Sequence, residues 1–249
     1  MNDRFGNGAL AGLLVLTLIL VGFSLRTRGP DSAAAGPSAT VSAPSTGTVS
    51  PSPSPSTSSG PVVFLGDSMT EGKSASAPAK RWTAIVAADL GLKEVNLGHA
   101  RTGYLRKGPE GSCGDKACPN FEGIVAQAVK ADPSTVIVTG GGNDSGLAPK
   151  DFSQAVSDTL TALKKALPDA KIYVVNPWWD LRPVPDSLSA QTSSVKQAAG
   201  EAKVSFLDTD QPLVDKPGLM VADGTNPNDA GHAVLAKAVT KAMGVSENG

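Results

Sequence analysis

Residues 61–70 read PVVFLGDSMT, an apolar run that is short enough for one buried strand and stops abruptly at Gly-Asp-Ser. A serine just past the carboxyl end of a parallel strand, behind a glycine that permits a tight turn, presents its hydroxyl at the sheet edge where α/β proteins bind ligands. Ser68 is therefore a candidate nucleophile. It also fits the N-cap of a helix in a plain Gly-Asp-Ser turn, so the chemical interpretation depends on partners further along the chain.

From residue 61 onward, short β-rich runs alternate with stretches of helical periodicity, a pattern typical of βαβ units. The clearest buried strand, Thr135–Thr139, runs into a glycine-rich segment that ends in Asn143 and Asp144. The pattern predicts one three-layer αβα domain over residues 61–249, built on a parallel five-stranded sheet. The expected strands cover residues 62–65, 95–97, 135–139, 171–176 and 204–207. The expected helices cover residues 81–90, 121–131, 150–167, 189–202 and 228–243.

The charge balance argues against nucleic acid as a partner. The chain of 249 residues has 22 basic and 23 acidic residues, a formal net charge of −1 and an ordinary hydrophobic content of 40%. Domains that bind nucleic acid or anionic membranes electrostatically carry a basic patch or stripe. We therefore expect no nucleic-acid partner.

Residues 1–28 contain a nearly unbroken apolar run, Ala9–Leu25, with arginines on both sides. The length of this run lies between that of a long signal-peptide core and that of a short membrane span, so the segment is a signal segment or a membrane anchor. An alanine triplet at residues 33–35 could form a cleavage site, but it lies some way past the run, which favours an uncleaved anchor. Basic residues at both ends leave the orientation open.

Residues 29–60 consist almost wholly of Ser, Thr, Pro, Ala and Gly. This composition cannot bury enough apolar surface to offset the entropy of ordering the chain, so we expect a disordered stalk. At roughly 3 Å per residue, the stalk could hold the domain up to about 100 Å from a bilayer. The two N-terminal segments together predict an exported protein that is anchored in the membrane or secreted to the cell envelope.

Cys113 and Cys118 are the only two cysteines of the chain. An even, close pair in an exported protein predicts a disulfide, which should stabilise the fold by roughly 2 kcal/mol. Free thiols and half of a metal site are the alternatives. Because no second cluster of Cys or His lies nearby, we expect no metal and no cofactor.

Four polar blocks follow one another along the domain, at residues 66–69, 96–103, 141–144 and 223–228. In order and strand context, these blocks resemble the GDSL or SGNH hydrolases, which are serine esterases and acyl hydrolases on a flavodoxin-like sheet. The resemblance implies that Ser68 attacks an ester carbonyl and that its own backbone N–H helps to hold the oxyanion. It also implies that the side-chain amide of Asn143 donates to the oxyanion. The alternative role for Asn143 is that of an N-cap or turn residue.

The second block departs from the family pattern. A family member would carry a glycine five residues after the strand asparagine Asn96, and this position is Arg101, with Gly103 two residues further on. The family's oxyanion donor in this block is a backbone N–H, so an arginine does not exclude it. The resemblance leaves open whether Arg101 or Gly103 supplies the donor, and whether Arg101 is a surface charge and Gly103 a turn residue.

The fourth block departs at the catalytic base. The family pattern is Asp-x-x-His-Pro, whereas this chain has Asp223 and then Asn226 in the histidine position, followed by the expected proline. An asparagine amide cannot take a proton near pH 7, so a chain in which Asn226 faces Ser68 should be nearly inactive. His232 stands in a second Asp-x-x-His spacing and is the alternative base; otherwise it is an ordinary helix histidine. The only other histidine, His99, lies in the loop after the second expected strand.

Trp178, Trp179 and Arg182 follow the fourth expected strand and could line an acyl or sugar pocket, although tryptophans also commonly cover a core edge. The whole pattern predicts an exported serine esterase or acyl hydrolase, or an acyltransferase of the same type. Its substrate would be a small-molecule, glycan or lipid ester. Asn226 favours the alternative of a catalytically silent binding module or an inactivated variant. We expect a monomer.

Overall fold

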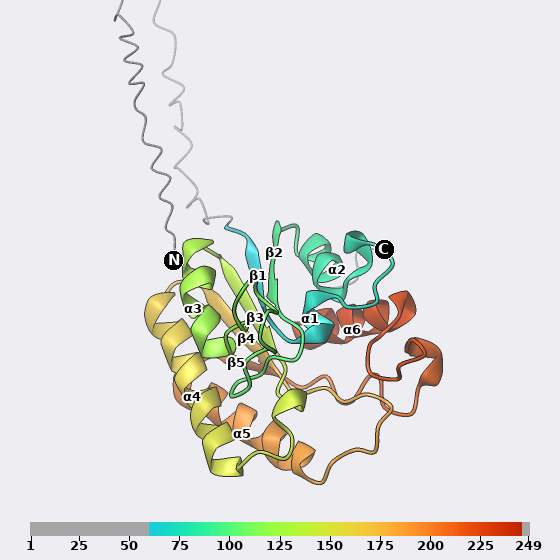
Figure 1. The fold of residues 1–249 in the computed structure, drawn as a ribbon. Helices are drawn as coiled ribbons and strands as arrows, with labels where there is room; N and C mark the ends of the chain where they lie inside the picture. The colour runs from blue at the N-terminus through green and yellow to red at the C-terminus, as the bar shows by residue number, and fades with distance from the viewer. Residues whose placement is uncertain (1–59, 246–249) are drawn as a thin grey trace, which may run out of the picture. The chain divides into compact units, whose positions relative to one another are not determined.

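A parallel sheet of five strands, in the spatial order β2-β1-β3-β4-β5, forms the centre of the domain (Figure 1). The computed structural model describes residues 60–245. The predicted anchor over residues 1–28, and the stalk over residues 29–60 apart from its last residue, lie outside the described part. Within residues 60–245, no helix combines the length and the apolar character that crossing a bilayer requires.

All five predicted strands are present, with small shifts at their ends. The strands are β1 (Val62–Gly66), β2 (Glu94–Gly98), β3 (Thr135–Thr139), β4 (Lys171–Val175) and β5 (Ser205–Leu207). The helices are α1 (Ser68–Glu71), α2 (Trp82–Asp89), α3 (Phe121–Lys130), α4 (Pro149–Ala166), α5 (Ser187–Ala202) and α6 (Asp229–Ala242), with short 3₁₀ turns η1 (Pro78–Lys80), η2 (Gly142–Asp144) and η3 (Pro217–Leu219). The sequence pattern predicted five of these helices and missed α1, which is only four residues long.

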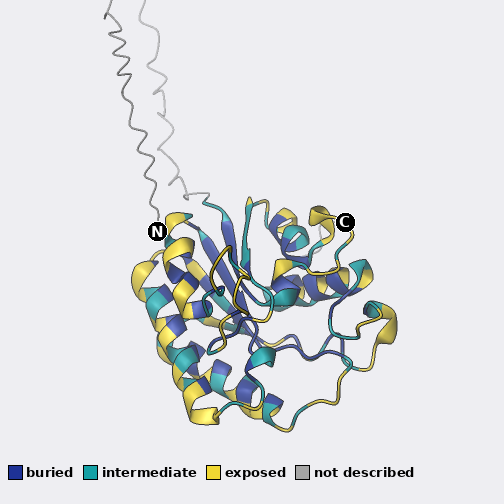
Figure 2. Cartoon of the chain, viewed as in Figure 1, coloured by how far each residue is buried: buried dark blue, intermediate teal, exposed yellow. Residues whose placement is uncertain are grey.

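Successive residues of the central strands serve opposite faces of the sheet, because side chains alternate along a strand. Val63 and Leu65 of β1 pack with α3, α4 and α5, whereas Val62 and Phe64 pack with α2 and α6. Both central strands, β1 and β3, are buried along their whole length, as Figure 2 shows. The three-layer αβα fold and the parallel sheet are therefore confirmed (Figure 1).

The register of the three neighbouring strands fixes where the polar loops begin. Gly66 at the end of β1 pairs with Gly98 at the end of β2 and with Thr139 at the end of β3. The loops that follow these three strands therefore leave the sheet at the same edge. These loops carry the first three polar blocks of the sequence.

Candidate active site

Ser68 is the first residue of α1, immediately after β1. The N-cap of this helix is Asp67, whose carboxylate accepts a hydrogen bond of 3.0 Å from the backbone N–H of Met69. Capping is thus done by the aspartate of Gly-Asp-Ser, and the serine is left free for another role. The backbone N–H of Ser68 belongs to the first turn of the helix, where amides have no partner within the helix.

Ser68 opens into a cavity of about 300 Å³ at the carboxyl edge of the sheet. The cavity brings together eight residues that the sequence singled out: Ser68, Arg101, Asn143, Trp178, Trp179, Arg182, Asp223 and Asn226. It does not include Gly103, His99 or His232. Five further lining residues, Asp67, Met69, Ala100, Gly142 and Thr225, lie within the polar blocks but had no predicted role, and the sequence did not indicate Lys73 or Asp180.

The geometry separates the two candidates for the second oxyanion donor. The backbone N–H of Arg101 donates to Ser68 Oγ at 3.3 Å, and Arg101 lines the cavity. The backbone N–H of Gly103 instead donates to the carbonyl oxygen of Arg106 at 2.9 Å. Arg101, and not Gly103, is therefore placed to supply a backbone donor beside the serine.

Gly103, in the loop between β2 and α3, packs against a buried carboxylate. The carboxylate of Asp144 is buried and accepts backbone N–H groups from Tyr104 at 2.8 Å, Arg106 at 3.0 Å and Leu105 at 3.3 Å. Burial raises the pKa of this carboxyl, and the backbone hydrogen bonds oppose that rise. A Cβ atom at Gly103 would lie 2.6 Å from Cγ of Asp144. Only glycine at position 103 lets the carboxylate approach the loop so closely.

We expect Gly103→Ala to destabilise the domain by roughly 2 kcal/mol or more, since the added methyl group must displace a buried, hydrogen-bonded carboxylate. Urea unfolding measures the effect. Gly200 in α5 is the matched control, because a Cβ there meets no atom within 4 Å and alanine is the better helix former. A loss no larger in Gly103→Ala than in Gly200→Ala would contradict the packing role.

Asn143 lies in η2, after β3. Its side-chain nitrogen Nδ2 donates to the carbonyl oxygen of Thr102 at 2.9 Å. A primary amide has two N–H groups, so this bond orients the side chain and leaves one donor over. Since both Asn143 and Ser68 line the same cavity, the predicted nucleophile and the predicted amide donor converge.

Asp223 holds an amide where the family pattern has an imidazole. Nδ2 of Asn226 donates to one carboxylate oxygen of Asp223 at 2.6 Å, and the backbone N–H of Asn226 donates to the other at 2.9 Å. These bonds, the side-chain bond above all, together with the backbone N–H of Thr225, lower the pKa of Asp223 to about 2. Asn226 itself is buried to all but 8%. The carboxylate is thus preserved as an orienting group, but the group it orients has no proton acceptor on nitrogen.

His232, the alternative base, is fully buried and does not line the cavity. The backbone N–H of Trp82 donates to its Nδ1 at 3.4 Å, and its Nε2 lies 3.2 Å from the carbonyl oxygen of Lys73. The ring therefore carries its proton on Nε2 and is neutral, and burial lowers its pKa. Both nitrogens are occupied by backbone groups, so this placement does not suit a base for Ser68 and fits the ordinary helix histidine.

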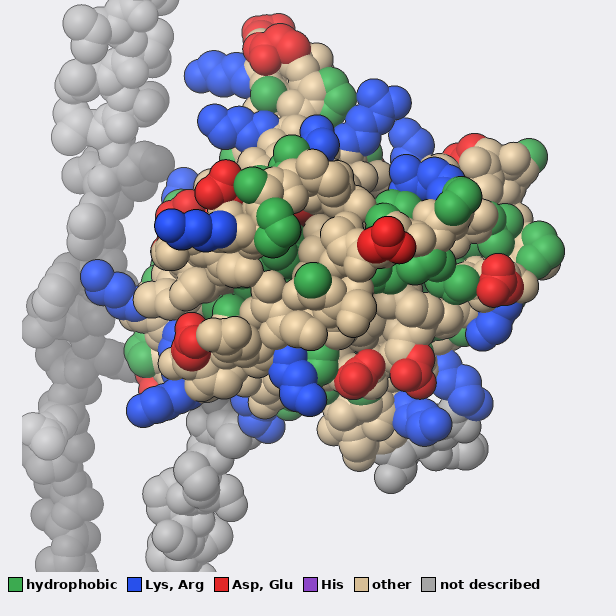
Figure 3. Space-filling model, turned by 90° about the horizontal axis from the view of Figure 1, so that it is seen from below, with side chains coloured by type: hydrophobic (Ala, Val, Ile, Leu, Met, Phe, Trp, Pro, Cys, Tyr) green, Lys and Arg blue, Asp and Glu red, His purple; other side chains and the backbone are tan. Residues whose placement is uncertain are grey.

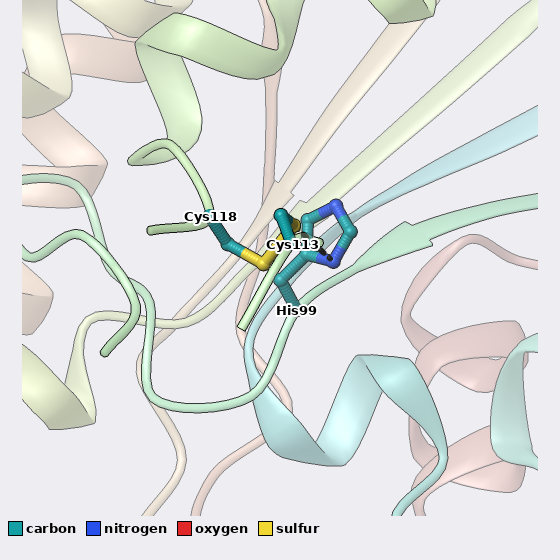
Figure 4. A group of neighbouring side chains, drawn as sticks. All are labelled: His99, Cys113 and Cys118. Atoms are coloured by element: carbon teal, nitrogen blue, oxygen red, sulfur yellow. Dashed lines mark hydrogen bonds between the residues drawn. A yellow bond between two sulfur atoms is a disulfide. The ribbon is translucent and has the colours of Figure 1, made fainter. Parts of the chain in front are cut away.

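Cys113 and Cys118 form the predicted disulfide, with their Cα atoms 4.8 Å apart. Nδ1 of His99 lies 3.8 Å from Sγ of Cys113, so the second histidine packs against the disulfide (Figure 4). The three side chains have the spacing of a metal-ligand group. Both sulfur atoms are consumed by the disulfide, which leaves His99 as the only free ligand of the three.

Trp178 and Trp179 both cover the edge of the core and line the cavity. Trp178 donates from Nε1 to Oγ1 of Thr209 at 2.8 Å and packs edge-on against Trp82, with ring centroids 5.3 Å apart. The guanidinium of Arg182 lies over the ring of Trp179 at 4.6 Å and pairs with the buried carboxylate of Asp180 at 2.6 Å. The two interpretations of Trp178 and Trp179 are therefore compatible.

The carboxyl group of Asp67, next to the candidate nucleophile Ser68, has a raised pKa. Burial raises the pKa of its carboxyl to about 6, from 3.8, and the nearby Asp144 adds to the rise. The folded protein therefore keeps a proton on Asp67 at pH values where the unfolded chain has lost it. The stability that this proton contributes is complete below about pH 4 and is lost as the pH rises through about 6.

We expect Asp67→Asn to be more stable than the parent protein at pH 7, on the order of 2 kcal/mol, and close to it at pH 4. The amide oxygen of asparagine can still cap Met69 but does not ionise. We expect a gain in the free energy of unfolding that is smaller than the full pKa shift would give, because Asp67 borders the cavity and water screens its charge. Urea unfolding at the two pH values tests this. A difference that does not change with pH would contradict the raised pKa.

The chain is similar in sequence to the GDSL-like lipases and acylhydrolases. The model of the GDSL-like lipase/acylhydrolase family matches residues 64–234. A GDSL lipase of Mycobacterium tuberculosis is 32% identical over 187 residues, covering 71% of this chain and 78% of the relative.

Solved structures share the fold at low sequence identity. A putative lipolytic protein of the G-D-S-L family from Desulfitobacterium hafniense has a TM-score of 0.56 at 16% identity, covering 73% of this chain and 98% of the other. A carbohydrate acetylesterase from Sinorhizobium meliloti has a TM-score of 0.57 at 17% identity, covering 74% and 98%.

Proposed function

Because this chain belongs to the GDSL-like lipase/acylhydrolase family, we propose that it is a serine ester hydrolase in which Ser68 attacks the carbonyl carbon of the ester. The observation that carries the proposal is the backbone N–H of Arg101, 3.3 Å from Ser68 Oγ, in a cavity that Asn143 also lines. A nucleophile beside converging N–H donors is the arrangement that acyl transfer requires.

The reaction would proceed in two displacements. Ser68 Oγ bonds to the carbonyl carbon, and the oxygen that gains negative charge accepts hydrogen bonds from the backbone N–H groups of Ser68 and Arg101 and from Nδ2 of Asn143. The alcohol then leaves with a proton, and water attacks the acyl-serine to release the acid and restore the hydroxyl. Asn226 cannot take the serine proton, so water must carry it, and turnover is slow.

The cavity suits a small, polar ester better than a lipid surface. Three Asp and three Lys or Arg residues line it. On the face seen from below in Figure 3, hydrophobic, cationic and anionic side chains are interspersed. Val184 is the only large hydrophobic side chain that is exposed among residues 60–245, whereas membrane-docking surfaces present an apolar patch.

A second function is a binding module that holds an ester or acylated glycan without turning it over. The hydrogen bonds between Asn226 and Asp223 favour it, because they complete the polar network of the site without a base. Binding would need only the proposed oxyanion donors and the walls of the cavity.

We further propose that residues 1–28 export the domain and hold it at the cell envelope, with residues 29–60 as the spacer. The apolar run between arginines and the Ser- and Pro-rich composition support this. The disulfide is consistent with an oxidising compartment.

Hydrolysis of 4-nitrophenyl acetate by the full chain and by Ser68→Ala tests the primary proposal. We expect slow hydrolysis above the buffer rate that Ser68→Ala abolishes. Equal rates in the two proteins would reject the hydrolase and leave the binding module, which ligand titration would then address.

A further inference from the structure

Arg101 has a backbone conformation that a side chain normally avoids. Its φ angle is +63°, in the left-handed region, and its position is the one at which the resembled family carries glycine. Five other non-glycine residues between 60 and 245 also have positive φ angles, and none of them lines the cavity. A strained residue beside a reactive group is a candidate for a functional role, because glycine would adopt the same backbone conformation without strain.

Two cations border the cavity without a partner. The side chains of Arg101 and Lys73 are exposed, and neither makes a hydrogen bond or an ion pair with any residue from 60 to 245. Arg182, the third cation at the cavity, is already paired with Asp180. The other two carboxylates at the cavity are held by hydrogen bonds from neutral groups and do not pair with Arg101 or Lys73: Asp67 caps α1, and Asp223 holds Asn226.

We propose that Arg101, assisted by Lys73, selects esters that bear an anionic group, in its simplest form a carboxylate, near the ester bond. This rests on the proposed function, because it assigns a substrate class to the same site. The backbone N–H of Arg101 lies at the nucleophile, so its guanidinium, on the same residue, can reach a charge carried by a bound ester. A guanidinium presents parallel N–H donors that match a carboxylate.

A matched pair of substrates tests the charge alone. 4-Acetoxybenzoate and 4-acetoxybenzamide have nearly the same size and differ in one negative charge. We expect the ratio of their kcat/KM values to favour the anion in the parent protein and to fall about tenfold in Arg101→Gly, chiefly through KM. Added salt should lower the ratio in the parent protein and lower it less in Arg101→Gly, in which only Lys73 remains to attract the anion. Lys107→Ala is the control, since Lys107 is an exposed cation in the same loop that does not line the cavity.

A second pair places the charge on the acyl side, as the 4-nitrophenyl monoester of adipic acid and the same ester of adipic acid monoamide. A preference for the anion that depends on Arg101, in either pair of substrates, supports the proposal. The pair that shows it tells whether Arg101 recognises a charge on the alcohol side or on the acyl side of the ester. Ratios that Arg101→Gly leaves unchanged in both pairs overturn it. The melting temperature of Arg101→Gly should not fall, because glycine adopts the φ of +63° without strain.

Binding distinguishes failure of this proposal from failure of the hydrolase. The amides 4-acetamidobenzoate and 4-acetamidobenzamide cannot be turned over readily, and Trp178 and Trp179 at the cavity provide a fluorescence signal. If no ester is hydrolysed in a Ser68-dependent way, the hydrolase fails, and about tenfold tighter binding of the anion in the parent than in Arg101→Gly still supports selection by charge. Equal binding of the two amides by the parent overturns it.

Discussion

Replacing Asn226 by histidine should raise kcat for ester hydrolysis by about 10³ or more. Loss of the histidine of a serine protease triad costs on the order of 10⁶ in turnover, and Ser68, Asn143 and Asp223 of this chain line one cavity with Asn226. Asp223 already accepts a hydrogen bond from Nδ2 of Asn226 at 2.6 Å, the kind of bond that would orient an imidazole through its Nδ1–H. With a pKa of about 2, this carboxylate stays ionised over the whole working range of pH. Initial rates with 4-nitrophenyl acetate measure the gain.

Two controls isolate the base. Asn226→Gln changes the side chain at the same position without adding a proton acceptor and should give no gain. Ser68→Ala in the Asn226→His protein should remove the whole gain. The rate of Asn226→His should rise with pH around the ordinary histidine pKa of about 6.5, because only the neutral imidazole accepts the serine proton. A folded Asn226→His protein no faster than Asn226→Gln would show that position 226 does not reach the nucleophile.

The sheet was predictable because its signals are local. The short, largely apolar runs at residues 62–65 and 135–139 are each followed by a glycine, and near-continuous apolar runs are typical of buried parallel strands. The convergence of Ser68 and Asn143 was implied by the family resemblance, and it agrees with parallel strands ending at one edge of the sheet. The short helix α1 escaped prediction, because four residues contain too little periodicity to be read.

The contacts that decide between candidates lie far apart in the sequence. Asp144 is joined to the backbone of residues 104–106, some 40 residues away, and this removes Gly103 from the site. The backbone groups that occupy the two ring nitrogens of His232 belong to Lys73 and Trp82, 159 and 150 residues earlier. No local pattern encodes such pairs. The sequence analysis named Asp144 only as the residue after Asn143, and nothing in the sequence indicated that Asp180 lines the cavity.

Removal of the Asn143 amide should have the second-largest effect, a loss of about 10² to 10³ in kcat when Asn143→Ala is made in the Asn226→His protein. Nδ2 of Asn143 is held by the carbonyl oxygen of Thr102, and its second N–H remains to meet the oxygen on which negative charge develops. Because this charge exists only in the transition state, kcat should fall and KM should change little.

Asn120→Ala is the matched control for this loss. Asn120 also donates from Nδ2 to a carbonyl oxygen of the same loop, that of Tyr104 at 2.9 Å, but it does not line the cavity. Its replacement should lower the free energy of unfolding by about 1 kcal/mol and leave kcat nearly unchanged. If the two alanine variants lose similar, small amounts of kcat, Asn143 supports the loop and does not stabilise the oxyanion. A large loss confined to Asn143→Ala assigns the amide to the reaction itself, because the two residues share the loop contact and differ in access to Ser68.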